Sequence, residues 1–177
     1  VSTCFDNIKP PILIKTERLV ISDIEKTDKK AYMELYTDKE TNRFWGYDYL
    51  EDLKGEPNED YFYNFQQMLK EKKEEYTFAV RLEGQYIGEL VLYNFDYFGT
   101  AEIGFRFFKQ YRGKGYAFES CHTLLEYAFE ELKIKKAKSR CFKINEASKK
   151  LLNKLNFCLI EQDEEKFYYI LEQKDFK

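Results

Sequence analysis

The chain has 177 residues, of which 44% are hydrophobic, 34% charged and 18% aromatic. Its 29 Lys and Arg residues nearly balance its 32 Asp and Glu residues, leaving a formal net charge of -3 at pH 7. This composition is not that of a disordered or collagen-like chain. It also gives no global electrostatic reason to expect a nucleic acid or an anionic membrane as a partner. One globular domain over residues 1–177 is expected.

The apolar runs are short, and the longest, such as residues 88–93, fall far below the roughly 20 residues needed to span a bilayer. The first residues lack a basic segment followed by an apolar one, so no secretory signal is expected. The four cysteines stand singly and the chain has one histidine, which gives no metal-ligand spacing. We therefore expect a cytoplasmic protein with reduced thiols, no metal and no membrane partner.

The first half of the chain predicts a strand at residues 16–24, a helix at about 26–36 and a second helix from 61 to about 75. Residues 42–60 combine aromatic and acidic side chains without periodicity and read as a long loop. Three strand candidates follow at 76–82, 86–95 and 101–108. The tight connection at residues 83–85 predicts an antiparallel meander.

The second half alternates helices and strands. A helix opening at 117 carries an apolar stripe that reaches Leu132, and a strand is expected at 138–142. Asn145 is a candidate N-cap of a helix that turns Ala147 and Leu152 inward, and Asn156 can adopt a left-handed cap. Strands at 159–162 and 166–172 complete a mixed α/β layer.

A glycine segment lies between the third meander strand and the long helix. Such a strand-loop-helix junction leaves backbone N–H groups free to bind phosphate. Gly113 and Gly115 permit the close approach that a pyrophosphate requires. The spacing fits neither a Rossmann fingerprint nor a P-loop, and a simple tight turn remains the alternative.

In this context the sequence resembles the GNAT superfamily of acyl-CoA-dependent N-acetyltransferases. Arg112, Gly115 and Ala117 fill the three fixed places of its signature Gln/Arg-x-x-Gly-x-Gly/Ala. The resemblance extends from residues 16–20 to 145–157, and its nearest branch is the ribosomal-protein-alanine N-acetyltransferase type. It implies a single-domain GNAT-like α/β fold, in which a mixed, mostly antiparallel sheet is flanked by helices and opens into a splayed cofactor cleft.

The resemblance also implies roles for individual residues. Backbone groups of Phe105 and Phe107 would align the pantetheine of acetyl-CoA, Asn145 would touch its arm, and Ser148 would donate a proton to the leaving thiolate. Many members have a tyrosine acid where this chain has Leu152. The pyrophosphate would be held by the cofactor loop, which comprises Arg112, Gly113, Lys114, Gly115, Tyr116 and Ala117.

Several of these residues could instead have purely structural roles. Asn145 and Ser148 could serve only as a helix cap and its neighbour. Glu102 is the candidate general base, with a structural ion pair to a cation such as Arg106 as the alternative. An α-amine, with a pKa of about 7.7 to 8.0, needs less help from a base than a lysine-like amine near 10.4.

The 42–60 segment is the candidate acceptor site, in which Trp45 and Tyr47 would pack a substrate while carboxylates attract a cationic amine. An ordinary exposed loop is the alternative. The lysine-rich stretch 133–154 reads as a solvated face. The alternative interpretation is that these lysines contact the 3′-phosphate of CoA or ribosomal RNA, although nucleic-acid binding is not the expected function.

These observations predict an N-acetyltransferase that moves an acetyl group from acetyl-CoA to a primary amine by direct attack in a ternary complex. The acceptor would be a protein N-terminal α-amine or a small cationic amine. A non-catalytic acyl-CoA-binding sensor is the alternative, motivated by Leu152. The sequence leaves the oligomeric state open, a homodimer included.

Overall fold

The computed structural model describes residues 2–45 and 58–177. Their centre is an eight-stranded sheet in the order β1-β2-β3-β4-β5-β6-β8-β7, in which only the β5–β6 pair is parallel. The strands are β1 (Leu13–Lys15), β2 (Leu19–Asp23), β3 (Glu75–Leu82), β4 (Gln85–Tyr93), β5 (Thr100–Phe107), β6 (Lys136–Phe142), β7 (Cys158–Gln162) and β8 (Lys166–Glu172). The predicted α/β class is confirmed.

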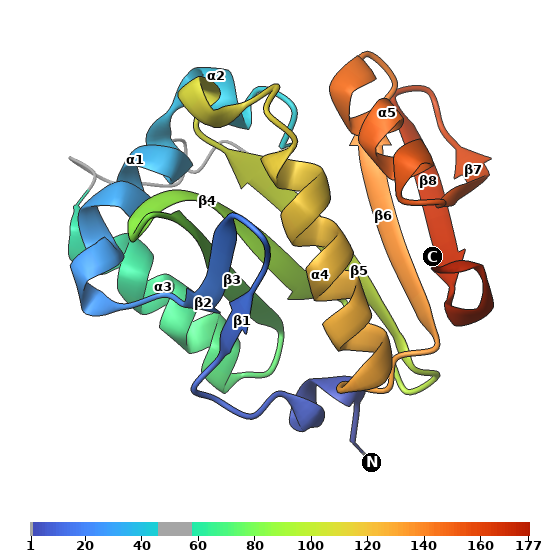
Figure 1. Cartoon of the computed structure of the whole chain (residues 1–177), viewed down its shortest axis with the longest axis horizontal. Coiled ribbons are helices and arrows are strands. Elements are labelled where there is room, and N and C mark those ends of the chain that lie inside the picture. The colour runs from blue at the N-terminus through green and yellow to red at the C-terminus, as the bar shows by residue number, and fades with distance from the viewer. Residues whose placement is uncertain (1, 46–57) are drawn as a thin grey trace.

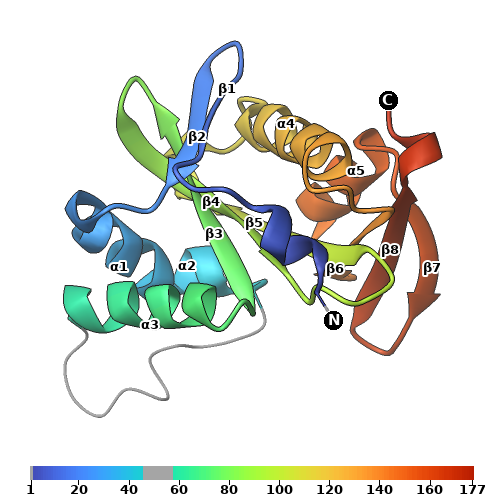
Figure 2. The same ribbon diagram turned by 90° about the horizontal axis from the view of Figure 1, so that it is seen from below.

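Helices cover both faces of this sheet. Helices α1 (Lys29–Thr37), α2 (Lys39–Asn42) and α3 (Glu59–Glu71) lie on one face, and α4 (Tyr116–Glu130) and α5 (Glu146–Lys154) lie on the other (Figure 2). Short 3-10 helices occur at Cys4–Asn7, Lys26–Asp28, Lys109–Tyr111 and Gln173–Asp175. The two faces bury separate apolar clusters, a larger one beneath α4 and a smaller one beneath α1 and α3.

The alternation of side chains along each strand explains these two clusters. On β3, Tyr76, Phe78 and Val80 belong to the cluster beneath α4, whereas Ala79 belongs to the cluster beneath α1. The β3–β4 hairpin closes through Gly84 at φ 81°. The left-handed backbone there matches the strand twist, and the predicted meander of β3, β4 and β5 is confirmed.

Four expectations about the elements need correction. The strand predicted at residues 16–24 is the shorter β2, and the short, largely exposed β1 before it was not predicted. Helix α3 ends at Glu71, because the chain must turn before β3 begins at Glu75. Leu132 is fully buried but lies beyond the end of α4. Ala147 is exposed at the first turn of α5.

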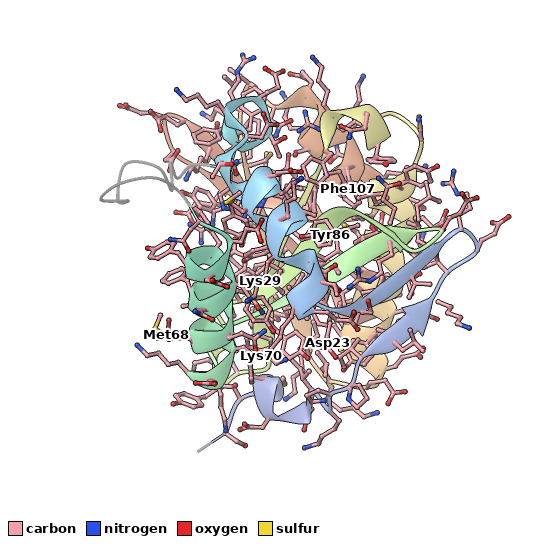
Figure 3. The ribbon with its side chains drawn as sticks, turned by 90° about the vertical axis from the view of Figure 1, so that its left-hand side faces the viewer. Asp23, Lys29, Met68, Lys70, Tyr86 and Phe107 are labelled. Carbon is pink, nitrogen blue, oxygen red and sulfur yellow. The ribbon has the colours of Figure 1, made fainter. Side chains whose placement is uncertain are left out.

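The helices α1 and α3 form one layer over the sheet, as Figure 3 shows from the side. Met68 on α3 points away from the sheet and is 36% exposed, whereas Tyr86 lies beneath the helices and is 7% exposed (Figure 3). Lys70 of α3 lies 4.0 Å from the carboxylate of Asp23 on β2. The layer therefore covers the C-terminal end of β2, where Asp23 lies.

The two central parallel strands pair over only part of their length. β5 and β6 are in register from Thr100 to Glu102, and their pairing then stops, although β6 continues to pair with β8 up to Phe142. The strands diverge beside the N-terminal end of α4 (Figure 1). The sheet is thus split at its centre, which leaves one edge of β5 without a neighbouring strand.

Candidate active site

The cofactor loop connects β5 to α4 and has left-handed backbone at both of its glycines. Gly113 has φ 75°, and Gly115, the N-cap of α4, has φ 83°. A Cβ atom on Gly113 would have no atom within 4 Å, so the surface there is open. No side chain caps the first amides of α4, and they are free to bind an anion. The residues present therefore fit a pyrophosphate.

Two arginine side chains hold this loop in place. Arg18, at the start of β2, donates a hydrogen bond to the carbonyl of Lys114 (3.0 Å) and pairs with Glu119 of α4 (2.7 Å). Arg112 donates to the carbonyl of Phe107 (3.0 Å) and to Oγ1 of Thr41 (3.1 Å). Neither role could be predicted from the sequence, because Arg18 and Lys114, and likewise Arg112 and Thr41, are brought together only by the fold.

The apex of the split is marked by Ser139 on β6, whose hydroxyl donates to the carbonyl of Ile103 on β5 (2.9 Å). Backbone groups alternate in direction along a strand, so those of Phe105 and Phe107 face the same side as Ile103. This direction agrees with the predicted pantetheine contacts. The carbonyl of Phe107, however, is already bound by Arg112.

A single cavity of about 600 Å³ extends from the cofactor loop, along the free edge of β5, to α2 and the residues that follow it. Of the predicted site residues, Glu102 and Lys114 do not line it, and Tyr47 lies outside the described residues. Those that do line it are Trp45, Phe105, Phe107, Arg112, Gly113, Gly115, Tyr116, Ala117, Asn145 and Ser148. Predicted residues that lie far apart in the sequence thus share one cavity.

The start of α5 contributes two polar side chains to the cavity. Asn145 caps the helix, because its Oδ1 accepts a hydrogen bond from the amide of Ser148 (3.2 Å). The cap confirms one of the two readings of Asn145 and does not exclude the other, since both residues also line the cavity. Leu152 is fully buried in the main core and is absent from the cavity wall.

Glu102 forms an ion pair on the sheet face opposite α4. Its carboxylate lies 2.6 Å from Arg140 of β6 and accepts a further bond from Asn94 (3.1 Å). Burial opposes ionisation, but these hydrogen bonds outweigh it and hold the pKa of Glu102 below its ordinary value. The expected partner Arg106 instead pairs with Glu89. This geometry favours the structural alternative for Glu102.

The far end of the cavity is built around Arg106 and Trp45. The Arg106 guanidinium is buried, pairs with Glu89 and donates to Asn42 of α2. It lies between two aromatic rings, 3.7 Å from the ring centre of Tyr36 and 4.1 Å from that of Trp45. These cation–π contacts fix the position of Trp45.

Trp45 reaches the sheet because residue 104 is a glycine. A Cβ atom there would lie 3.1 Å from Cη2 of Trp45 and 3.5 Å from Cε1 of Tyr93. Such a separation is tighter than ordinary van der Waals contact, so a larger residue would displace the ring. Trp45, Gly104 and Tyr93 together form an aromatic wall that continues the cavity beyond the split.

Two carboxylates also line this end, and only Glu40 belongs to an exposed part of the chain. Glu75, the first residue of β3, is partly buried. Burial raises the pKa of Glu75, and the nearby Glu89 carboxylate raises it further, while Arg106 acts in the opposite direction. Sequence reasoning missed Glu75 because the predicted second helix ran to about residue 75, whereas Glu75 is the first residue of β3.

A split sheet with an anion-binding helix start at one end of the split defines the class of acyl-CoA-dependent N-acyltransferases. The family model described as the acetyltransferase (GNAT) domain matches residues 18–158. The chain belongs to this family and is an acetyl-CoA-dependent N-acetyltransferase, as expected from the cofactor loop.

Known proteins agree with this assignment. The chain is 30% identical to the uncharacterised N-acetyltransferase YnaD of Bacillus subtilis, over 91% of this chain and 98% of that protein. A GNAT-family acetyltransferase from Bacillus anthracis superposes with a TM-score of 0.77 at 25% identity, covering 92% of this chain and 99% of its own. Spermidine N-acetyltransferase from Vibrio cholerae, solved with CoA and spermine, shares the fold (TM-score 0.77, 16% identity, coverage 89% and 97%).

Membrane-spanning helices and metal-binding clusters are both absent from the described residues. Within residues 2–45 and 58–177, no helix has the length and apolar character needed to cross a membrane. The same residues contain no group of three His, Cys, Asp or Glu side chains arranged to hold a metal ion.

Proposed function

We propose that this enzyme transfers the acetyl group to a primary amine by direct attack in a ternary complex, with residues 1–177 acting as one catalytic domain. The acceptor is a small cationic amine or a protein N-terminal α-amine. One observation carries the proposal: a single cavity joins the anion-binding cofactor loop to a far end lined by aromatic rings and two carboxylates. Two substrates can therefore meet at the split of the sheet without leaving the protein.

The residues at the near end suit acetyl-CoA. The amides of the cofactor loop, from Gly113 to Ala117, would bind the pyrophosphate, helped by the positive end of α4. The free edge of β5 at Phe105 would pair with the amide groups of the pantetheine arm, with Asn145 on the opposite side. Bound acetyl-CoA supplies a thioester whose carbonyl carbon can be attacked by an amine.

The chain's own residues would then complete the transfer. A substrate held against Trp45 is positioned beside the split, which lowers the entropic barrier to attack. Ser148, at the first turn of α5, is the proposed proton donor to the leaving thiolate. The buried Leu152 offers no acid, so this proton comes from Ser148 or from water.

The far end favours a positively charged acceptor. Glu40 and Glu75 supply carboxylates, and Trp45 and Tyr93 supply aromatic faces that attract an alkylammonium group. The spermidine enzyme of Vibrio cholerae shares the fold and was solved with a polyamine. Polyamines and peptides with a free N-terminus are therefore the first acceptors to test.

The proposal is tested by calorimetry followed by turnover. Purified protein is titrated with acetyl-CoA, CoA and NADH, and thiol release is then measured with spermidine, with free N-terminal peptides and with N-terminally blocked lysine peptides. We expect binding of acetyl-CoA and CoA but not NADH, and thiol release that depends on the amine. Binding without release on the whole panel would contradict the proposal and favour an acyl-CoA sensor.

A further inference from the structure

We propose that Glu75 is the general base that takes the proton from the acceptor amine. The inference rests on the proposed function and adds to it the residue that prepares the nucleophile. It is drawn from the position of this carboxylate at the far end of the cavity and from the fate of the other carboxylates nearby.

Glu75 lies in a row that crosses three strands. In the sheet register Glu75 of β3 is opposite Tyr93 of β4, and Tyr93 is opposite Glu102 of β5. Glu75 and Tyr93 both line the cavity together with Trp45, whereas Glu102 does not. Of the two carboxylates in this row, Glu75 therefore lines the cavity, whereas Glu102 lies where the pairing of β5 and β6 ends.

The remaining carboxylates are engaged or exposed. Glu89 is fully buried and paired with Arg106, and Glu102 is paired with Arg140. Glu40 is exposed at the rim of the cavity. Within the part of the chain that the structure describes, Glu75 has no cation within salt-bridge distance, so an arriving ammonium group would be its partner.

The electrostatic surroundings suit a base that works near neutral pH. Burial raises the pKa of Glu75, the carboxylates of Glu89 and Glu74 add to this effect, and the Arg106 guanidinium opposes it. Tyr93, its cross-strand neighbour, stays protonated because burial raises the pKa of its hydroxyl. A carboxylate whose pKa lies closer to neutrality accepts a proton more readily at pH 7.

Glu75 accepts a proton from the ammonium form of the acceptor, and the nitrogen lone pair then attacks the thioester carbonyl carbon. A C–N bond forms and the C–S bond breaks. The proton that the nitrogen then loses replaces the one that Ser148 or water donates to the leaving thiolate. The products are an N-acetyl amide and CoA thiol, and Glu75 returns its proton to solvent.

The test replaces Glu75 with the nearly isosteric glutamine and uses the acceptor that gives the fastest turnover with wild-type protein. We expect Glu75→Gln to lower kcat/KM at pH 7 by about 100-fold, in the range typical of a lost general base. The acidic limb of the pH–kcat profile, which reports the base in the bound complex, should disappear. Affinity for acetyl-CoA should stay within twofold of wild type, which also shows that the variant is folded.

Two matched variants complete the experiment. Glu71→Gln removes an equal charge from an exposed residue at the end of α3, outside the cavity, and should leave kcat within twofold. Glu75→Asp keeps a carboxylate and should retain the acidic limb with a reduced kcat. A Glu75→Gln enzyme with normal kcat and an unchanged acidic limb overturns the inference, and so does a change confined to KM. Absence of turnover in the wild-type protein would instead contradict the proposed function itself.

Discussion

The two ends of the cavity are built by different means. The cofactor end consists of backbone: amides at the start of α4, two glycines with positive φ and one free strand edge. The acceptor end consists of side chains, in which Trp45, Tyr93 and Glu75 come from the segment after α2, from β4 and from β3. A site made of backbone groups depends little on side-chain identity and suits a cofactor that does not vary. In a site made of side chains, a few substitutions can change which acceptor is bound.

The side-chain end also needs a rigid support, and the buried ion pair supplies it. Arg106 and Glu89 are almost completely buried, and Arg106 holds both Asn42 of α2 and the ring of Trp45. Removing one partner of a buried pair typically costs about 3–5 kcal/mol, because the other charge is left uncompensated. The acceptor end is therefore held on the sheet by the Arg106–Glu89 ion pair, whereas the cofactor end is held in shape by its backbone conformation.

The largest expected effect is at the cofactor end, with Gly115→Val. At φ 83° a β-branched residue is strained by about 1–3 kcal/mol, which corresponds to roughly 5- to 150-fold weaker binding if the loop relaxes away from its binding conformation. Calorimetry with acetyl-CoA measures this loss. Gly84→Val is the control, because Gly84 has φ 81° in the β3–β4 hairpin, outside the cavity. It should lower stability but not affinity, and equal affinity losses in both variants would contradict the backbone account.

The corresponding change at the acceptor end is Trp45→Ala. Loss of the aromatic wall should raise the KM for the amine by about tenfold, near 1.4 kcal/mol, as expected for one cation–π and packing contact. Acetyl-CoA affinity should not change, because the described ring contacts of Trp45 are with Arg106 and Gly104 and not with the cofactor loop. Tyr97→Ala, which removes an aromatic ring that is 68% exposed, is the control. A loss of acetyl-CoA affinity in Trp45→Ala would show that the two ends are not independent.

Arg112→Ala addresses the contact between the two ends. Its side chain joins the carbonyl of Phe107 to Thr41 of α2, so its removal should cost about 1–2 kcal/mol of stability. We expect only about threefold weaker acetyl-CoA binding, well below the effect of Gly115→Val, because the loop amides remain. Urea unfolding and calorimetry measure the two quantities, with the neighbouring Lys109→Ala as the control. A larger affinity loss than in Gly115→Val would show that the guanidinium itself binds the cofactor.

The contrast between the two ends also explains what could be predicted from the sequence. The glycine loop, the cap at Asn145 and the meander are local patterns, and all three are found in the structure. Glu102 and Glu75 differ in the partners that the fold places beside them. Arg140 pairs with Glu102 from 38 residues away, whereas no described cation lies within salt-bridge distance of Glu75. A single sequence without contacts between distant residues could not separate these two carboxylates.

The smallest expected effect tests whether Glu102 belongs to the scaffold of the split. The folded-state pKa of Glu102 is lowered, so the folded protein holds this carboxylate ionised at a pH where the unfolded chain binds a proton. The resulting stability is complete above the unfolded pKa of about 4.3 and is lost as the pH falls through the lowered folded value.

Arg140→Ala should therefore lower the free energy of unfolding by about 1 kcal/mol or less at pH 7, a small value because the Arg140 side chain is 39% exposed to solvent. The difference from wild type should shrink as the pH falls below the unfolded pKa and through the lowered folded value, as urea unfolding over a series of acidic pH values can show. A difference that does not depend on pH would mean that Arg140 stabilises the split by packing on Tyr168, 5.2 Å from its ring centre, and not through its charge. Glu102 would then have an unneutralised carboxylate, and the distinction drawn between it and Glu75 would fail.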